Sequence, residues 1–393
     1  MTRRVSIPAG LSETSALYIA VAQEHDGAEA VLSVMRRRGS SALISATRSA
    51  IRKMEPATGS ATADRLISRH LFFAYFCSIA RALDDAHIYI MRSRIPWNGH
   101  GMTIRDWNAL MWILPAIQLA DQGLAREVLL RVCEVHGYAP GAGIHYLDGS
   151  LFEPGFSLEG AASYAIAVDG YIVQSGDDKI VEEPALADSL YGSHDDIEVR
   201  KHETLPLYST EIDPDGTVPE FEYTTHGNAI AALALDILAH TLDEQTAAKI
   251  QDPASVRAAV LRQFSVEGLG GKTVLTGSSD LAGHTSPAST PPTSLYWLPF
   301  HDLLSRDDSI YRRTVKQLEG GIPSSLEARC ARIVGPNGAA ALDWLRRAPL
   351  DNGIAAEVVD ADGRATGNGG DAALSGLIAY TVWYAVNALG LKL

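Results

Sequence analysis

The chain has 393 residues, of which 46% are hydrophobic and 20% are charged, and its formal net charge is −14. This length predicts one large or two medium domains, and the composition is that of a soluble globular protein with a sizeable core. The negative charge argues against nucleic acid and anionic membrane surfaces as partners, and it favours a neutral or cationic ligand. We expect no membrane span, because no stretch reaches the roughly 18 uninterrupted apolar residues that a span needs.

Cysteine usage and the N-terminus indicate a cytoplasmic protein. Three cysteines are an odd number, and we expect Cys77, Cys133 and Cys330 to be reduced thiols. The N-terminus carries Arg3 and Arg4 but no apolar run long enough for a signal peptide. The twelve histidines show no close pair at metal-ligand spacing, so a zinc site is not expected.

Helical patterns follow one another along the whole chain. The first sixty residues have apolar spacing at 17–22, 30–35 and 43–54, and we expect an N-terminal helical segment (1–60) packed on a domain formed by residues 61–393. In that domain the apolar periodicity and the turn residues predict helices over about 62–83, 108–122, 124–135, 156–175, 178–190, 224–240, 243–250, 253–264, 295–304, 308–318, 339–347 and 372–389.

Apolar helices alternate with more polar ones. Long polar loops, such as 137–154, 205–223 and 349–371, lead into the apolar helices, and short turns join these to the polar ones. A ring of helical hairpins needs this pattern, because only its inner helices are buried on most sides. We therefore predict an all-α fold, an (α/α)6 toroid of about twelve helices whose long loops meet at one end and build the site.

The stretch from Pro96 to Gly123 has the clearest chemistry. Arg105 and Asp106 stand at the start of an apolar helix, after a glycine-rich loop that contains His100. Trp97 and Trp107 flank this pair. The guanidinium of Arg105, which can donate two parallel hydrogen bonds, and the carboxylate of Asp106 lie beside flat apolar rings. Such a set suits a sugar, which has hydroxyls on its edge and C–H groups on its faces.

Other motifs are incomplete. The segment 267–273 lacks the first glycine of a phosphate loop, the segment 213–216 lacks the later ligands of a calcium loop, and no serine nucleophile elbow occurs. What remains is carboxylates in the long loops, and hydrolysis of a glycosidic bond needs two of them, one as acid and one as base or nucleophile. The candidates at loop-to-helix junctions are Glu153, Glu159, Glu211, Asp213, Asp215, Glu220, Glu222, Glu357, Asp360 and Asp362.

Four junctions resemble those of the six-hairpin glycosidases, the clan of glucoamylases and of the glucosidase half of glycogen-debranching enzymes. Ile104-Arg105-Asp106-Trp107 looks like the clan's Arg-Asp motif, which grips hydroxyls of the terminal sugar. Pro154 to Glu159 resembles the next junction and implies a substrate contact for Glu159. The stretches 207–211 and 223–229 are similar to the junction that carries the general acid and include His226.

The residue that corresponds to the acid stays open among three. Glucoamylases have a Trp-Glu pair close before the threonine, whereas this chain has Thr210-Glu211 and a longer acidic loop, so the acid is Glu211, Asp213 or Asp215, with Glu211 preferred. The stretch from Ala356 to Gly363 resembles the part that holds the general base, which implies that role for Glu357.

The resemblance implies an inverting, exo-acting hydrolase of α-linked, glucose-type sugars with no metal and no organic cofactor. Its catalytic residues would be Glu211, Asp213 and Glu357, and its substrate contacts Trp97, His100, Arg105, Asp106, Trp107, Glu159 and His226. The partner would be a small saccharide or glycoside, with no nucleic acid and no membrane, and a homo-oligomer stays open.

Two other function classes are compatible with a helical toroid. Sugar epimerases and polysaccharide lyases use His or Tyr as acid and base, and His100, His145, His226 and Tyr146 would then act. A catalytically inactive sugar-binding protein is the third alternative, because the clan's Trp-Glu pair is not matched.

Overall fold

The structure is a computed structural model, and it describes residues 6–83, 86–268, 270–286, 294–319, 323–367 and 369–393. The chain divides into two units, which we describe separately. Unit 1 comprises Met1–Glu55 and Arg81–His87, and unit 2 comprises Pro56–Ala80 and Ile88–Leu393. Among the described residues, no helix combines the length and the apolar character needed to cross a membrane.

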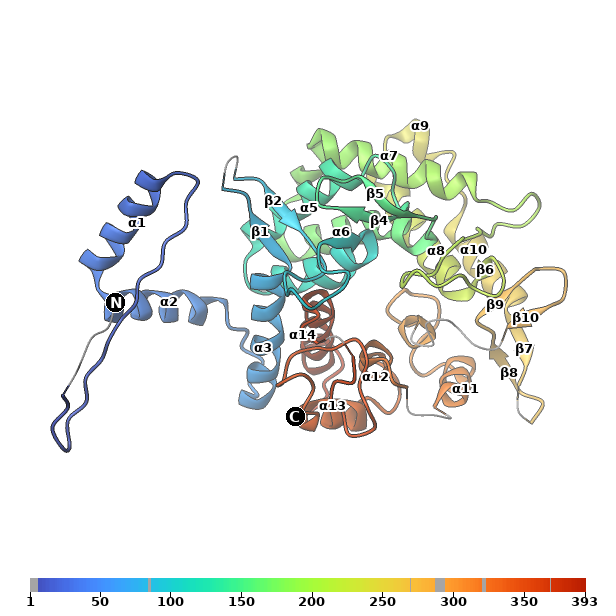
Figure 1. Cartoon of the computed structure of the whole chain (residues 1–393). Coiled ribbons are helices and arrows are strands. Elements are labelled where there is room, and N and C mark those ends of the chain that lie inside the picture. Colours follow the sequence, from blue (N-terminus) through green and yellow to red (C-terminus); the bar gives the residue numbers. More distant parts are fainter. Residues whose placement is uncertain (1–5, 84–85, 269, 287–293, 320–322, 368) are drawn as a thin grey trace. The chain divides into compact units, whose positions relative to one another are not determined.

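Unit 1 contains two helices, α1 (His25–Arg38) and α2 (Ser40–Met54), drawn in dark blue in Figure 1. Gly39 joins them with a φ of 77°, a value that glycine adopts easily. Neither helix has a buried residue. The helical patterns at 30–35 and 43–54 are therefore confirmed, whereas residues 17–22 are not helical.

Unit 2 is built from helical hairpins with one outer and one inner member. The outer helices are α3 (Ala61–Cys77), α5 (Gln122–His136), α7 (Pro184–Val199), α10 (Pro253–Gln263), α11 (Ser309–Leu318) and α13 (Gly338–Arg347). The inner elements are the π-helix η1 (Asn108–Ile113) with its continuation α4 (Leu114–Gln118), then α6 (Leu158–Ser175), α8 (Thr225–Thr241), η3 (Ser294–Trp297), α12 (Leu326–Ala331) and α14 (Ala372–Asn387). Two short helices, η2 (Asp178–Glu182) and α9 (Glu244–Ala247), lie in connections.

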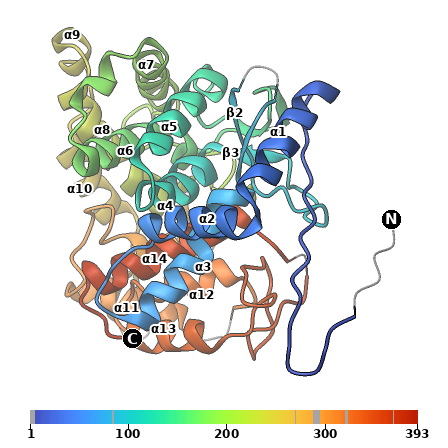
Figure 2. The same ribbon diagram turned by 90° about the vertical axis from the view of Figure 1, so that its left-hand side faces the viewer.

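The inner elements close into a ring. Each contacts the next in chain order, from η1 and α4 through α6, α8, η3 and α12 to α14, and α14 packs against η1. The last helix also lies along the first outer one, as Figures 1 and 2 show for α14 and α3. The predicted (α/α)6 toroid is thus confirmed for unit 2.

Burial explains why the inner helices are apolar. Eleven residues each of α6, α8 and α14 are buried, whereas α3 buries six, as a helix with one covered face should. The inner helices begin with side-chain caps: Ser157, Thr224 and Asp371 each accept the backbone N–H three residues further on. These caps fix where the long loops enter α6, α8 and α14.

Short strands lie in the loops. The strands are β1 (Ile79–Arg81), β2 (Ile88–Ile90), β3 (Thr103–Arg105), β4 (Gly143–Tyr146), β5 (Leu151–Pro154), β6 (Tyr223–Thr224), β7 (Ser265–Glu267), β8 (Thr273–Leu275), β9 (Ser278–Ser279) and β10 (Thr285–Ser286). An antiparallel sheet in the order β3-β4-β5 pairs Arg105 with Ile144, and a second sheet has the order β10-β9-β6. The first sheet therefore ties together the loops that precede η1 and α6, and the second ties the strand that precedes α8 to residues 278–286.

In three places of unit 2 the helices of the structure differ from the prediction. The helix predicted over 62–83 ends at Cys77, and residues 79–81 form β1. The helix predicted over 295–304 is reduced to the four residues of η3. The short helix α12 was not predicted, because six residues are too few to show a helical period. Cys133 and Cys330 are buried free thiols, and Cys77 is partly buried.

Candidate functional site

A polar pocket of about 260 Å³ lies among the loops of unit 2. It is lined by Arg92, His100, Thr103, Ile104, Arg105, Asn108, Ile144, Glu153, Asp215, Gly216, Thr217 and Glu357. Residues from four separate stretches of the chain meet here, namely 92–108, 144–153, 215–217 and 357. Of the predicted site residues, the pocket brings together His100, Arg105 and Glu357.

Arg105 ends β3 and presents its guanidinium to this pocket. Its Nη2 lies 4.0 Å from Oε2 of the half-exposed Glu153, a loose ion pair. Burial lowers the pKa of Arg105, while Glu153 and Asp215 oppose that shift. Apart from this pair, no described residue makes a hydrogen bond or ion pair with the guanidinium, which leaves its donors directed at the pocket.

Glu357 also lines the pocket and lies beside an arginine. Arg92 lies with Nη2 3.6 Å from Oε1 of Glu357. It donates a hydrogen bond from Nε to Oδ2 of Asp371 (2.8 Å), and its Nη2 forms an ion pair with the same oxygen at 2.7 Å. Burial disfavours the charged guanidinium, yet the attraction of Asp371 outweighs it and raises the pKa of Arg92. Glu357 is 56% exposed, so it is a solvent-accessible carboxylate beside a permanent cation.

The turn from Asp213 to Thr217 borders the polar pocket. Asp213 donates its N–H to the carbonyl of Thr217 (2.8 Å), and Gly216 donates to the carbonyl of Asp213 (2.8 Å). The side chain of Asp213 is buried, and its Oδ2 has no partner among the described residues. Burial, reinforced by Glu159 and Asp215, raises the pKa of Asp213 to about 9. This carboxyl is therefore protonated at neutral pH.

Glu159 is the acidic neighbour of Asp213 and sits in the first turn of α6. It is buried, with Oε1 3.4 Å from Nδ1 of His226 and Oε2 3.4 Å from Oγ of Ser157. The predicted contacts Glu159 and His226 therefore touch each other, but neither lines the polar pocket.

Glu211 has the wrong surroundings for a general acid. It accepts hydrogen bonds from the N–H of Phe156 (2.9 Å) and from Nη1 of Arg200 (2.7 Å). These bonds lower its pKa, whereas an acid needs a raised one. Glu211 is 52% exposed, and neither Glu211 nor Asp213 lines the polar pocket, whereas Asp215 does. The buried Asp213, with its raised pKa, therefore has surroundings closer to those of a general acid than Glu211 has.

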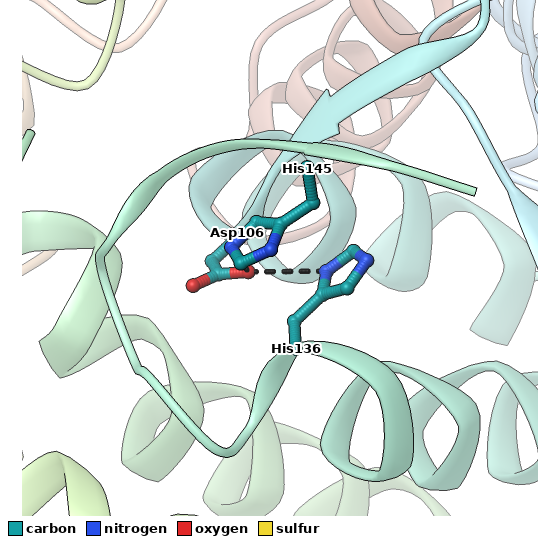
Figure 3. A group of neighbouring side chains, drawn as sticks. All are labelled: Asp106, His136 and His145. Atoms are coloured by element: carbon teal, nitrogen blue, oxygen red, sulfur yellow. Dashed lines mark hydrogen bonds and ion pairs between the residues drawn. The ribbon is translucent and has the colours of Figure 1, made fainter. Parts of the chain in front are cut away.

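Asp106 does not join Arg105 in the pocket but is turned into the protein. Its Oδ1 lies 3.2 Å from Nδ1 of His136 and 3.7 Å from Nε2 of His145, and its Oδ2 accepts the N–H of Gly141 (2.9 Å). Figure 3 shows the carboxylate and the two imidazoles together. Asp106, for which a sugar contact was predicted, is thus part of a buried cluster that ties the turn before η1 to α5 and β4.

This cluster has the composition of a metal site, since the ligand atoms of Asp106, His136 and His145 lie within 4.8 Å of one another. The two imidazoles are stacked, with centroids 4.2 Å apart and planes at 7°. A ring-nitrogen lone pair lies in the plane of its ring, so two parallel rings cannot direct their lone pairs at one ion. The arrangement fits a hydrogen-bonded anchor rather than a metal centre. The sequence spacing had not indicated that these histidines meet.

A second hollow, the axial cavity, runs between the inner helices and has a volume of about 270 Å³. Every inner element contributes to its wall, for example Leu110, Ile166, Leu233, Trp297, Glu327 and Leu377. The predicted contacts Trp107 and His226 line it, with their rings edge to face at 5.9 Å. Pro214 also lines it, so the turn that holds Asp213 contributes to both hollows.

The remaining predicted residues do not converge. Trp97 is 60% exposed and lies outside both hollows. Of the four residues that an epimerase or lyase would need, His145 is in the buried cluster and Tyr146 is exposed, stacked edgewise on Phe152. The arrangement therefore favours carboxylate chemistry at the polar pocket over His and Tyr chemistry.

Two functional residues were missed in the sequence. Asp371 precedes a long apolar helix, which marks it as a helix cap, and its second bond to Arg92 shows only in the fold. Arg92 carries no signal of its own, because it lies in an extended run without a recognisable motif.

The comparisons with known proteins add to this geometry. The sequence matches no model of a known protein family and no curated protein. Among solved structures, the chain is similar to a metal-independent α-mannosidase from Streptococcus pneumoniae in a non-productive complex with α-1,6-mannobiose. The TM-score is 0.71 at 11% identity, over 87% of this chain and 98% of that one.

Two further structures agree. A wild-type protein described as a glycosidase gives a TM-score of 0.62 at 14% identity, over 84% of this chain and 98% of that one. A bacterial glucoamylase complexed with acarbose gives 0.56 at 14% identity, over 83% of this chain and 56% of the glucoamylase. The chain has the six-hairpin glycosidase fold. The likeness extends over most of unit 2 and is a likeness of fold.

Proposed function

We propose that the protein is a glycoside hydrolase that acts where the turn from Asp213 to Thr217 borders the polar pocket, with Asp213 as general acid and Glu357 as general base. The observation that carries the proposal is the contrast between these carboxyls. Asp213 is buried, with a pKa raised to about 9, while Glu357 is accessible and lies beside Arg92. The reaction needs one carboxyl group that holds a proton for the leaving oxygen and a second one that solvent water can reach.

The substrate would be an α-linked hexose at the non-reducing end of a small glycoside. Arg105 and His100 offer donors for ring hydroxyls, and Glu153 and Asp215 offer acceptors. Glucose-type and mannose-type sugars are both candidates, since a glucoamylase and an α-mannosidase share the fold. We infer an inverting reaction, in which Glu357 activates a water on the face of the sugar opposite Asp213.

The test uses aryl α-glucosides and α-mannosides with the anomer of the released sugar followed by NMR. We expect release of the β-anomer, and a loss of kcat of roughly 100-fold or more in Glu357→Gln and in Asp213→Asn, as for removal of a general base or acid. Glu211→Gln is the matched control and should keep its kcat. Hydrolysis that survives both catalytic substitutions would remove the proposal.

A further inference from the structure

The axial cavity has a chemistry that the proposed hydrolysis does not use. Its wall is mostly apolar and includes the large aromatic side chains Trp112, Phe300 and Tyr380. Among the described residues that line it, none is a lysine or arginine, and carboxylates contribute at Asp169 and Glu327. A hollow of this kind disfavours an anion and suits a neutral apolar molecule.

Two histidines that line the cavity each have one imidazole nitrogen that is buried and has no hydrogen-bond partner among the described residues. These atoms are Nε2 of His226 and Nδ1 of His301, and the two rings lie 5.2 Å apart. Nδ1 of His226 lies 3.4 Å from Oε1 of Glu159, and in the neutral tautomer that donates to this carboxylate Nε2 is an acceptor. Burial lowers the pKa of His301 well below its usual value, so this ring is neutral.

An unpaired buried acceptor costs free energy, and a ligand hydroxyl would recover it. The volume sets the size of that ligand. An apolar cavity of roughly 150 Å³ holds one benzene ring, and the axial cavity has about 270 Å³. It therefore has room for two fused rings.

We propose that the axial cavity binds a neutral, flat, apolar molecule of about two fused rings with one hydroxyl group, which donates to the imidazole of His226 or His301. Such a molecule has two sources. It is either the aglycone of the substrate, which would enter past Trp107 and Pro214 near Asp213, or a separate ligand. The first source rests on the proposed hydrolase activity, whereas the binding itself does not.

The binding test titrates the full-length protein with 2-naphthol and, in parallel, with naphthalene, and follows tryptophan fluorescence. We expect 2-naphthol to bind about fivefold or more tightly, the value of one hydrogen bond to a buried acceptor. In His226→Phe or in His301→Phe this preference should fall below about twofold. Equal affinity of the wild type for both probes, or no saturable binding, would overturn the proposal.

Variants in the wall separate the cavity from the surface. Leu233→Trp fills the cavity and should weaken 2-naphthol binding about tenfold or more. Val173→Trp adds the same side chain at an exposed position of α6 outside the lining and should leave binding unchanged. If Leu233→Trp does not fold, Leu233→Ala serves instead, because a larger cavity should admit 2-hydroxyanthracene, which the wild type should exclude. If neither substitution at Leu233 changes the binding, the probe binds elsewhere and the proposed site is wrong.

Inhibition kinetics separate the two sources. If the cavity receives the aglycone, 2-naphthol should compete with an aryl glycoside substrate; if it takes a separate molecule, the inhibition should not be competitive. Absence of any hydrolysis would defeat the proposed function but leave the fluorescence result standing, so the two failures are distinguishable.

Discussion

Asp371 caps α14 through Oδ1, which accepts the N–H of Leu374 at 3.0 Å, and holds Arg92 through Oδ2 at 2.7 Å. One buried carboxylate thus fixes both the start of the last inner helix and the cation beside Glu357. The position of the proposed base is in this way coupled to the packing of the ring.

The first prediction separates these two roles. Asp371→Asn keeps an N-cap of similar quality but removes the charge that holds Arg92. We expect a loss of roughly 3 kcal/mol in the free energy of unfolding, because the buried guanidinium of Arg92 keeps its charge without its partner, and a fall in kcat of roughly tenfold, because Arg92 no longer fixes Glu357. Urea unfolding and kcat are the measurements. A loss of stability with an unchanged kcat would show that Asp371 does not act on Glu357.

The second prediction concerns pH and stability. The folded pKa of Asp213 is raised to about 9, above the unfolded value near 3.9. The folded state therefore keeps a proton that the unfolded state has lost. Stability from this group is full below pH 4 and falls as pH rises toward 9, with a slope of up to about 1.4 kcal/mol per pH unit.

Asp213→Asn removes this titration while it preserves the shape of the neutral carboxyl. Compared with the wild type, the variant should gain relative stability between pH 5 and 9 in thermal unfolding. Parallel pH curves for the two proteins would contradict the raised pKa. The alkaline limb of wild-type activity should lie near the same pH, because the proton donor is then lost.

The third prediction tests the polar pocket through Gly216. This glycine has a φ of 89°, and an added Cβ would overlap the guanidinium of Arg105. Gly216→Ala should displace Arg105 and raise KM about tenfold, the loss of one charged hydrogen bond. Gly176→Ala is the matched control: its φ is 72° with nothing near the added atom, so it should cost about 1 kcal/mol of stability without changing KM.

The fourth prediction concerns the Asp106 cluster. Asp106→Ala leaves the N–H of Gly141 and the imidazole of His136 without their acceptor, and we expect a destabilisation of roughly 2–4 kcal/mol. Because the stacked rings do not fit a metal, neither EDTA nor added Zn²⁺ should shift the wild-type Tm by more than about 1 °C. A Zn²⁺-dependent rise of several degrees that disappears in His145→Ala would reverse this interpretation.

The sequence allowed the ring to be predicted because inner and outer helices differ in composition. α8 and α14 are apolar on all sides, and their patterns were clear; η3 and α12 are too short to show a period and were misjudged or missed. Of the predicted site residues, Arg105 and Glu357 both line the polar pocket. Arg105 and Asp106 are consecutive in the sequence, but their side chains have different surroundings, because the backbone changes from strand to helix between them. Burial, not spacing, distinguishes Asp213 from Glu211, and only the fold shows it.

The closure of the ring also bears on chain connectivity. Oγ of Ser60 donates to the carbonyl of Leu393 at 3.2 Å, and α3 lies along α14. The point at which the polypeptide enters the circle is thus the point at which it leaves, and each hairpin has a neighbour on both sides. A gene rearranged to link residue 393 to residue 60 and to open in the exposed connection after α9 would encode the same circle of helices. Such a permutant would start on a different hairpin without changing which side chains face one another.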